Sequence, residues 1–327
     1  MDLRSPLTFR PAYQTLVWGG RRMQRWRSDL PPGPIGESWD LSDHTRGMSV
    51  VAQGPLAGRT LRELVAEAGP ALVGANFRGG VFPLMIKTID AADNLSVQVH
   101  PDDATASILG AGDRGKTECW VILADGGALF QGTRPGVTRD AFERALGDHT
   151  LAATLNRFEG KAGDVFFIEA RTVHALGGGC LLYEIQQTSD ITFRVYDWDR
   201  MGLDGKPRPL HIAQSLATID FSRTGFGPIR PAWQSDPAGR IASRPLVTCP
   251  YFAVEQFRIS AGATLRRPPG DTCAVVTCID GRGVLSTDGG ALPLVTMQTA
   301  LLPAAAGSWR AESAGAPLDL LVATPKV

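Results

Sequence analysis

The sequence has 327 residues, of which 43% are hydrophobic and 20% are charged, and 33 basic side chains balance 33 acidic ones. A chain of this length can bury a large core and suggests two domains, or one large β domain with an appendage. Zero formal net charge argues against a protein specialised for nucleic acid or for an anionic membrane, because both require a basic surface. The 37 glycines and 23 prolines favour many short strands over a helical bundle.

Neither export nor membrane insertion is indicated. Residues 1–14 contain charged residues and prolines where a signal peptide requires an apolar run, and no stretch of about 18 apolar residues is present. The cysteines are odd in number, scattered, and without a Cys-x-x-Cys pair, which predicts reduced, buried thiols in a cytoplasmic protein. They are Cys119, Cys180, Cys249, Cys273 and Cys278.

The expected elements change in character along the chain. Two helices inside irregular structure are expected in the first eighty residues, one of them at 59–68 with Thr60 as its N-cap. Strands follow at 83–90 and 94–100, where apolar residues are contiguous or alternate with polar ones. The other elements expected before residue 240 are helices near 102–109, 138–158 and 211–221, and strands at 118–125, 164–170, 180–187 and 191–198.

Beyond about residue 240 the sequence consists of short β runs separated by Gly and Asp turns, without helices between them. This change predicts two domains, residues 1–240 and residues 241–327, the second smaller and all β. The second domain contains no histidine, so no metal site is expected there. We expect it to pack against the first domain or to shape one wall of its cleft.

The segment around residues 95–102 is the most informative for function. In an extended strand alternate side chains share a face, so Ser96, Gln98 and His100 point one way and the apolar residues between them point the other. The polar set would line a cleft or a barrel interior, where polar groups are costly unless something is bound. The alternative is an edge strand with its polar face in water.

The side chains of three further residues could lie beside the polar face of this strand. Lys116 and Glu118 share a face at the start of a strand, although the common fate of such a pair is the protein surface. His174 lies in the turn that follows another strand. Two histidines and a glutamate on neighbouring strands of one barrel supply the ligands of a catalytic zinc site, which keeps one coordination position open. Manganese or iron are not excluded by this ligand type.

Charged residues also share a face in the segment after residue 187. If the segment is extended, Asp190 and Arg194 point the same way. An arginine directed into a barrel can hold a phosphate or stabilise an oxyanion. The alternative is a structural ion pair of Arg194 with Asp190 or Asp197. His211 begins a predicted helix and is expected to be structural.

Taken in chain order, these segments resemble the type I mannose-6-phosphate isomerases of the shorter bacterial kind. The resemblance spans roughly residues 17 to 200, and beyond about residue 240 it extends only to a general layout. The matching segments are Trp18-Gly19-Gly20, Ile35-Gly36-Glu37-Ser38-Trp39, FPLMIKTIDA, NLSVQVHPDD, GKTECW, TVHALGGG and QQTSDITFRVYDWDR. Thr117 stands where longer family members have proline, and the large helical domain of those members is absent.

The resemblance implies a mainly β, zinc-dependent cupin (jelly-roll) barrel with helical insertions and a smaller C-terminal β-barrel-like domain. It also implies interconversion of mannose 6-phosphate and fructose 6-phosphate through an enediol(ate). Carried over position by position, the ligands of one zinc ion per chain would be His100, Glu118 and His174, with Gln98 as the fourth.

The resemblance further places Lys116 and Arg194 at the reacting carbons, with Asp190 beside them. Lys87 and Ser96 become the candidates for binding the phosphate. Proton transfer between the carbons needs a base, for which Lys116, an ionised Asp190 and a zinc-bound hydroxide are alternatives.

Two other functions remain open from the sequence. One is another metal-dependent cupin enzyme, such as a different sugar isomerase or an oxygenase, although the charged residues beside the ligands argue against simple oxygenation. The other is a non-catalytic protein that binds a sugar phosphate. In each case we expect a small-molecule partner, no nucleic acid or membrane, and a monomer or small homo-oligomer.

Overall fold

The computed structural model describes residues 1–327 and forms two compact units that interleave along the chain. Unit 1 comprises residues 1–12, 39–85 and 230–327, and unit 2 comprises residues 13–38 and 86–229. The predicted division into functional domains near residue 240 stays a prediction, because these units are defined by packing alone. No helix is both long enough and apolar enough to span a membrane.

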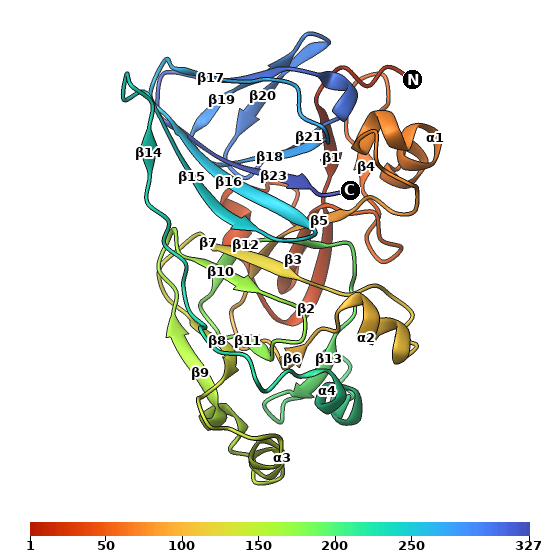
Figure 1. Ribbon diagram of the computed structural model, residues 1–327, viewed down its shortest axis with the longest axis vertical. Coiled ribbons are helices and arrows are strands. Elements are labelled where there is room, and N and C mark those ends of the chain that lie inside the picture. Colours follow the sequence, from red (N-terminus) through yellow and green to blue (C-terminus); the bar gives the residue numbers. More distant parts are fainter. The chain divides into compact units, whose positions relative to one another are not determined.

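Unit 1 is built from antiparallel strands (Figure 1). One sheet has the order β14-β15-β16-β23-β18-β21-β1-β4, and a second has the order β17-β22-β19-β20. Apolar side chains from both sheets, such as Val276 and Leu285, form one buried cluster. The strands are β1 Leu7–Arg10, β4 Val50–Val51, β14 Gln234–Ser235, β15 Ile241–Thr248, β16 Phe252–Ile259, β17 Thr264–Arg267, β18 Ala274–Asp280, β19 Arg282–Thr287, β20 Gly290–Val295, β21 Thr299–Leu302, β22 Trp309–Ser313 and β23 Leu318–Pro325.

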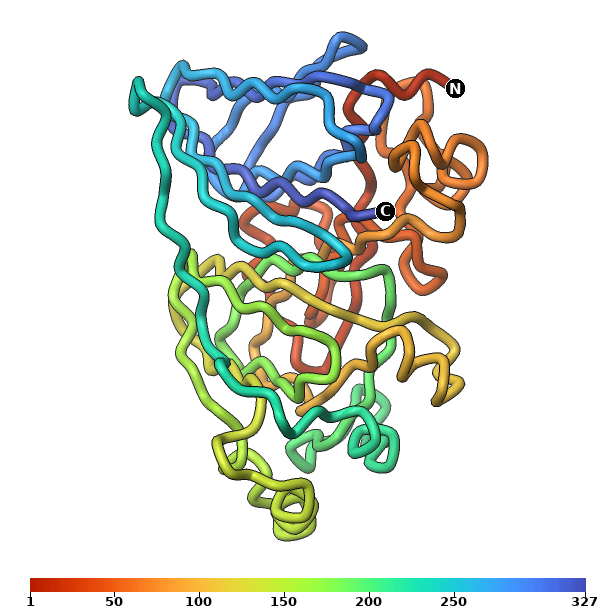
Figure 2. The backbone as a smooth tube through the Cα atoms, viewed as in Figure 1, coloured from red at the N-terminus to blue at the C-terminus, as the bar shows by residue number.

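The N-terminal strand of unit 1 belongs to the same sheet as the C-terminal strands (Figure 2). In that sheet β1 pairs with β21, and Leu7 lies opposite Leu301. Helix α1, Leu61–Val73, follows β4 and begins with a capping box in which Thr60 accepts a hydrogen bond from the backbone of Glu63. The helix predicted at 59–68 is therefore confirmed.

Unit 2 contains most of a six-stranded sheet, ordered β10-β7-β12-β5-β3-β2, and a five-stranded sheet, ordered β13-β6-β11-β8-β9. Trp18, Trp120 and Leu182 of the first sheet pack with Leu129 and Leu176 of the second in one buried cluster. The strands are β2 Ala12–Gly20, β3 Ile35–Leu41, β5 Leu84–Asp90, β6 Val97–Val99, β7 Glu118–Ile122, β8 Ala128–Thr133, β9 Leu155–Glu159, β10 Val165–Ile168, β11 His174–Leu176, β12 Leu181–Gln187 and β13 Phe193–Tyr196.

Three α-helices complete unit 2. They are α2 Asp103–Ile108, α3 Arg139–Gly147 and α4 Ile212–Thr218. The side chains of Asp102 and Thr138 cap α2 and α3 by accepting backbone N–H bonds. Phe142 on α3 is fully buried against Phe221, which follows α4.

Two sequence predictions about the elements are wrong. The helix expected at 138–158 ends at Gly147, and His149 takes a left-handed backbone conformation with φ 56°. A short 3-10 helix, Leu151–Thr154, follows, and β9 begins at Leu155. The first eighty residues are not irregular, because β1, β2 and β3 lie there. Strand β2 was missed because most of its side chains are only partly buried, which weakens the apolar pattern.

Candidate metal centre and active site

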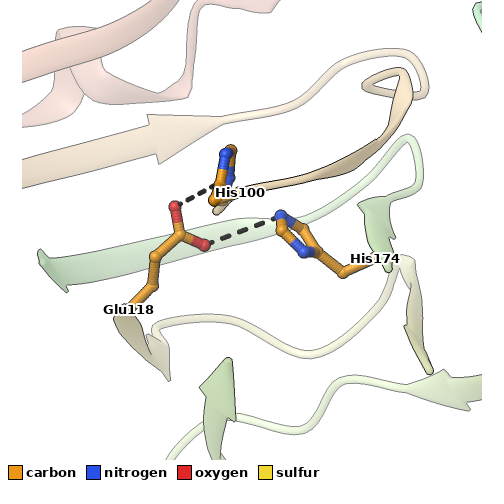
Figure 3. Close-up of side chains that lie close together, drawn as sticks. All are labelled: His100, Glu118 and His174. Carbon is orange, nitrogen blue, oxygen red and sulfur yellow. Dashed lines mark ion pairs between the residues drawn. The ribbon is translucent and has the colours of Figure 1, made fainter. Parts of the chain in front are cut away.

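Three strands each bring one buried side chain to a common point in unit 2. His100 directly follows β6, Glu118 begins β7 and His174 begins β11. Their ligand atoms lie within 4.8 Å of one another. One oxygen of Glu118 is 3.3 Å from Nε2 of His100, and the other is 3.7 Å from Nε2 of His174. Figure 3 shows the carboxylate directed toward both rings.

The local hydrogen bonds suit these side chains to metal ligation. Nδ1 of His174 donates to the carbonyl of Thr172 at 2.8 Å, which leaves the Nε2 lone pair facing Glu118. Oε2 of Glu118 is buried and has no hydrogen-bond partner. Because two imidazole nitrogens and a carboxylate are the donors of catalytic zinc sites, this set fits a divalent cation.

Burial controls the protonation of the cluster. Burial and the nearby ammonium of Lys116 lower the pKa of His100 to about 3, and burial also lowers the pKa of His174. Both rings are therefore neutral, the form that binds metals. Burial acts to raise the pKa of Glu118, but the ammonium of Lys116 outweighs it and holds that pKa well below its usual value. The carboxylate is therefore ionised.

Gln98 and Arg194 extend the cluster along the five-stranded sheet. Gln98 on β6 lies opposite His174 on one side and opposite Arg194 on the other. The Nε2 atom of Gln98 is 3.3 Å from Nε2 of His174. The polar face expected for Ser96, Gln98 and His100 is thus directed into a buried site and not into water, since all three side chains are mostly or fully buried.

Lys116 is not part of a surface charge pair. Its side chain is buried, and its Nζ lies 2.5 Å from Oε1 of Glu118 and 3.4 Å from Nε2 of His100. Burial acts to lower the pKa of Lys116, but the carboxylates of Glu118 and Glu184 outweigh it and raise that pKa above the usual value. The side chain is therefore an ammonium ion held against the candidate ligands.

Glu184 is a buried residue of this site that the sequence analysis missed. It lies on β12, and its Oε1, which has no hydrogen-bond partner, is 3.9 Å from Nζ of Lys116. Burial and the charge of Glu118 raise the pKa of Glu184 to about 8. The sequence held a signal, because Glu184 and Gln186 are polar residues that share one face of a largely apolar strand.

The two phosphate candidates lie within unit 2 as buried side chains. Lys87 on β5 is 2% exposed, and its Nζ is 3.2 Å from Oε2 of Glu37 on β3. Ser96 directly precedes β6 and is 4% exposed. Because β7, β12, β5 and β3 are neighbours in the sheet, Glu118, Glu184, Lys87 and Glu37 come from successive strands.

Arg194 is half-buried and does not make the structural ion pair that was its alternative role. Its Nη1 donates to the carbonyl of Pro209 at 2.9 Å, and its Nε is buried without a partner. Asp197 instead accepts hydrogen bonds from Arg200 and Arg208. The remaining candidate, Asp190, is partly buried and its backbone N–H donates to the carboxylate of Asp113.

The histidine expected to be structural supports the strand of Arg194. Nδ1 of His211 accepts the backbone N–H of Arg194 at 3.1 Å, and the backbone N–H of His211 donates to the carbonyl of Arg194 at 2.7 Å. His211 thus fixes β13 beside the cluster without joining it.

The raised pKa of Glu184 predicts how the stability of the metal-free protein depends on pH. Between about pH 4.5 and pH 8 the unfolded chain releases the proton of Glu184 and the folded protein keeps it, so wild-type stability declines as the pH rises through this window. Glu184→Gln removes the titration. We expect the free energy of unfolding of the variant, relative to that of the wild type, to rise by roughly 3 to 4 kcal/mol between pH 5 and pH 8.

Urea denaturation of the metal-free proteins at the two pH values measures this gain. Glu159→Gln, at an exposed position of β9, is the matched control and should show no comparable change. A pH-independent difference between Glu184→Gln and the wild type would mean that Glu184 is already ionised in the folded protein.

The fold and the buried His–Glu–His cluster define an enzyme of the cupin class with a candidate metal site. The family model described as phosphomannose isomerase type I, catalytic domain, matches residues 7–119, and the one described as mannose-6-phosphate isomerase, cupin domain, matches residues 243–317. The mannose-6-phosphate isomerase of Streptococcus mutans is 36% identical over 267 residues, which are 81% of this chain and 82% of the relative. The chain belongs to the type I phosphomannose isomerase family.

Further relatives cover nearly the whole chain. Mannose-6-phosphate isomerase ManA of Bacillus subtilis is 34% identical over 94% of this chain and 96% of its own length. A crystal structure of the mannose 6-phosphate isomerase from Bacillus subtilis has a TM-score of 0.88 at 30% identity and covers 98% of this chain and 99% of that one. A putative mannosephosphate isomerase from Archaeoglobus fulgidus shares the fold, with a TM-score of 0.78 at 21% identity over the full length of both chains.

Proposed function

We propose that this chain is a zinc-dependent aldose–ketose isomerase that interconverts mannose 6-phosphate and fructose 6-phosphate through an enediol(ate). Membership of the family supports the reaction. The single structural observation that carries the proposal is the buried cluster of His100, Glu118 and His174, with the ammonium of Lys116 held against it. Such a set suits chemistry in which negative charge develops on substrate oxygens.

His100, Glu118 and His174 would hold one zinc ion per chain, with Gln98 as the fourth ligand. When bound, the ion would supply a positive charge that polarises the substrate oxygens. The neutral rings and the ionised carboxylate already have the protonation states that ligation requires. The hydrogen bond from His174 to Thr172 keeps one ring in the tautomer that ligation needs.

The remaining residues act on charge and protons. Arg194 stabilises the negative charge that develops when a proton leaves the carbon beside the carbonyl, because its guanidinium is always protonated. Lys116 and Asp190 are the proposed proton carriers between the two carbons. Glu184 lies 3.9 Å from Lys116 and its pKa is raised to about 8, so near neutral pH it holds a proton of its own beside this ammonium.

The proposed phosphate ligands are Lys87 and Ser96, because an ammonium and a hydroxyl are suitable donors to phosphate oxygens. Glu37, 3.2 Å from Lys87, fixes the position of that ammonium.

We further propose that residues 1–240 carry the catalysis and that residues 241–327, which lack histidine, support them. All five cysteines are buried thiols, which supports a cytoplasmic location. A monomer or small homo-oligomer is proposed.

A coupled assay on the purified protein tests the proposed function. Mannose 6-phosphate should be converted to fructose 6-phosphate, the activity should stop on chelation, and zinc should restore it. Stoichiometric zinc with binding of mannose 6-phosphate but no turnover would replace the isomerase with a sugar-phosphate-binding protein. Bound iron with oxygen consumption would replace it with an oxygenase.

A further inference from the structure

The loop between β10 and β11 contacts both candidate histidine ligands through its backbone. The backbone N–H of Arg171 donates to the carbonyl of His100 at 2.6 Å. One residue later, the carbonyl of Thr172 accepts the Nδ1 proton of His174 at 2.8 Å. The two peptide groups of this short turn therefore fix the backbone of His100 and orient the ring of His174.

The turn is held in a conformation that its sequence does not favour. Arg171 has φ 72°, the left-handed region that a residue other than glycine seldom occupies. Such a conformation persists where surrounding contacts determine it, and it occurs often at functional sites. Contacts from outside the turn should therefore hold it in this conformation.

Those contacts come from the last residue of α4 and the segment that follows it. The carbonyl of Arg171 accepts the backbone N–H of Asp220 at 3.0 Å, and Nε of Arg171 donates to the carbonyl of Thr218 at 3.1 Å. We define residues 218–223 as the clasp, because this segment contacts the turn from one end to the other.

Arg223 provides the side chain of the clasp. Its Nη1 donates to Oγ1 of Thr172 at 3.2 Å and lies 2.9 Å from the carboxylate of Glu169. Its Nε is 3.4 Å from Oδ2 of Asp220, so one guanidinium joins the clasp to both sides of the turn. Thr172 is buried, which limits competition from water at that contact.

We propose that the clasp positions the two histidines for metal binding, with Arg223 as its principal positioning residue and Thr172 as the residue through which it acts. The contacts of Arg223 are with Thr172, Glu169 and Asp220, and not with the candidate ligands. Its contribution is to hold the carbonyl of Thr172 where that carbonyl orients the ring of His174. The inference rests on the proposed metal site and adds a determinant of its affinity.

The test is the zinc affinity of the purified full-length protein, measured by competition with a chromophoric chelator. Arg223→Ala should weaken zinc binding about tenfold or more, the range found when groups that orient metal ligands are removed. Arg223→Lys keeps the charge but not the planar fork of donors, so it should restore only part of the affinity. Arg157→Ala, at an exposed arginine of β9, should bind zinc like the wild type.

A second variant separates positioning from general destabilisation. Thr172→Val removes only the hydroxyl that Arg223 contacts, and it should weaken zinc binding in the same direction with little further effect when Arg223→Ala is already present. Unchanged zinc affinity in both variants, with a lower unfolding midpoint for the metal-free Arg223→Ala protein, would overturn the proposal and leave a purely structural role. Failure of the wild type to bind zinc would instead contradict the proposed function.

Discussion

Replacing Glu118 by glutamine should remove both the bound metal and the isomerase activity. Glu118 supplies the one negative charge between two neutral imidazoles, and its oxygens lie 3.3 and 3.7 Å from their Nε2 atoms. Glutamine keeps the size of the side chain but offers a neutral and weaker ligand. We expect less than about a tenth of the wild-type zinc content and a fall of at least about a thousandfold in kcat/KM.

Elemental analysis for zinc and the coupled assay measure the two effects together. Glu159→Gln makes the same chemical change at an exposed position of unit 2 and should leave both unchanged. Because Glu118→Gln also deprives the buried ammonium of Lys116 of its nearest anion, the folded state should lose about 3 kcal/mol. His174→Ala removes a ligand without isolating a buried charge, so it gives the same test in a more stable background.

A Glu118→Gln protein with full zinc and normal turnover would show that the ion, or the chemistry, lies elsewhere. Full zinc with lost turnover would assign Glu118 to catalysis and not to ligation. Loss of zinc in His174→Ala but not in Glu118→Gln would leave the two histidines as the principal ligands.

The candidate metal site could be predicted from strand parity and residue type. Gln98 and His100 are two residues apart, as are Lys116 and Glu118, and side chains at that spacing share a face in any strand. The structure brings His100 and Glu118 together from neighbouring parts of the chain. His174 could be grouped with them by residue type and by the resemblance, but no local pattern encodes its position, because the pairing of β11 with β6 is a long-range contact.

The same reason explains why Glu184 was missed. Its strand, β12, is fully buried, and contiguous apolar residues normally indicate core. The antiparallel pairing of β12 with β7 places Glu184 opposite Trp120, one pleat from Glu118. Only this register shows that the carboxyl of Glu184 lies near the ammonium of Lys116 and does not face solvent.

The fold was predicted best where the chain uses strong local signals. Thr60, Asp102 and Thr138 each begin a helix as N-caps, as residue type and spacing indicate. Strand β2 was missed because most of its side chains are only partly buried, and β1 pairs with β21 near the other end of the chain. For these strands the tertiary pairing decides the conformation, and local propensity carries little weight.

Replacing Arg194 by alanine should abolish turnover but, unlike Glu118→Gln, should leave the bound zinc in place. Arg194 lies one strand beyond Gln98 and two beyond His174, so its removal leaves the candidate ligands in place. Its Nη1 is held by the carbonyl of Pro209, and the Nε has no partner within the protein. A half-buried guanidinium with an unused, buried Nε donor is suited to a developing negative charge, and removing such a donor typically costs about a hundredfold to a thousandfold in kcat.

Arg194→Lys separates the charge from the geometry of the donor. A point charge at the end of a flexible chain should recover only a small part of the activity, because the planar fork is lost. Arg139→Ala, at an exposed arginine of α3 that pairs with Glu143, should have normal activity and zinc content. Wild-type kcat in Arg194→Ala would remove this residue from the mechanism. Loss of zinc in the same variant would show that Arg194 instead supports the metal site through Gln98.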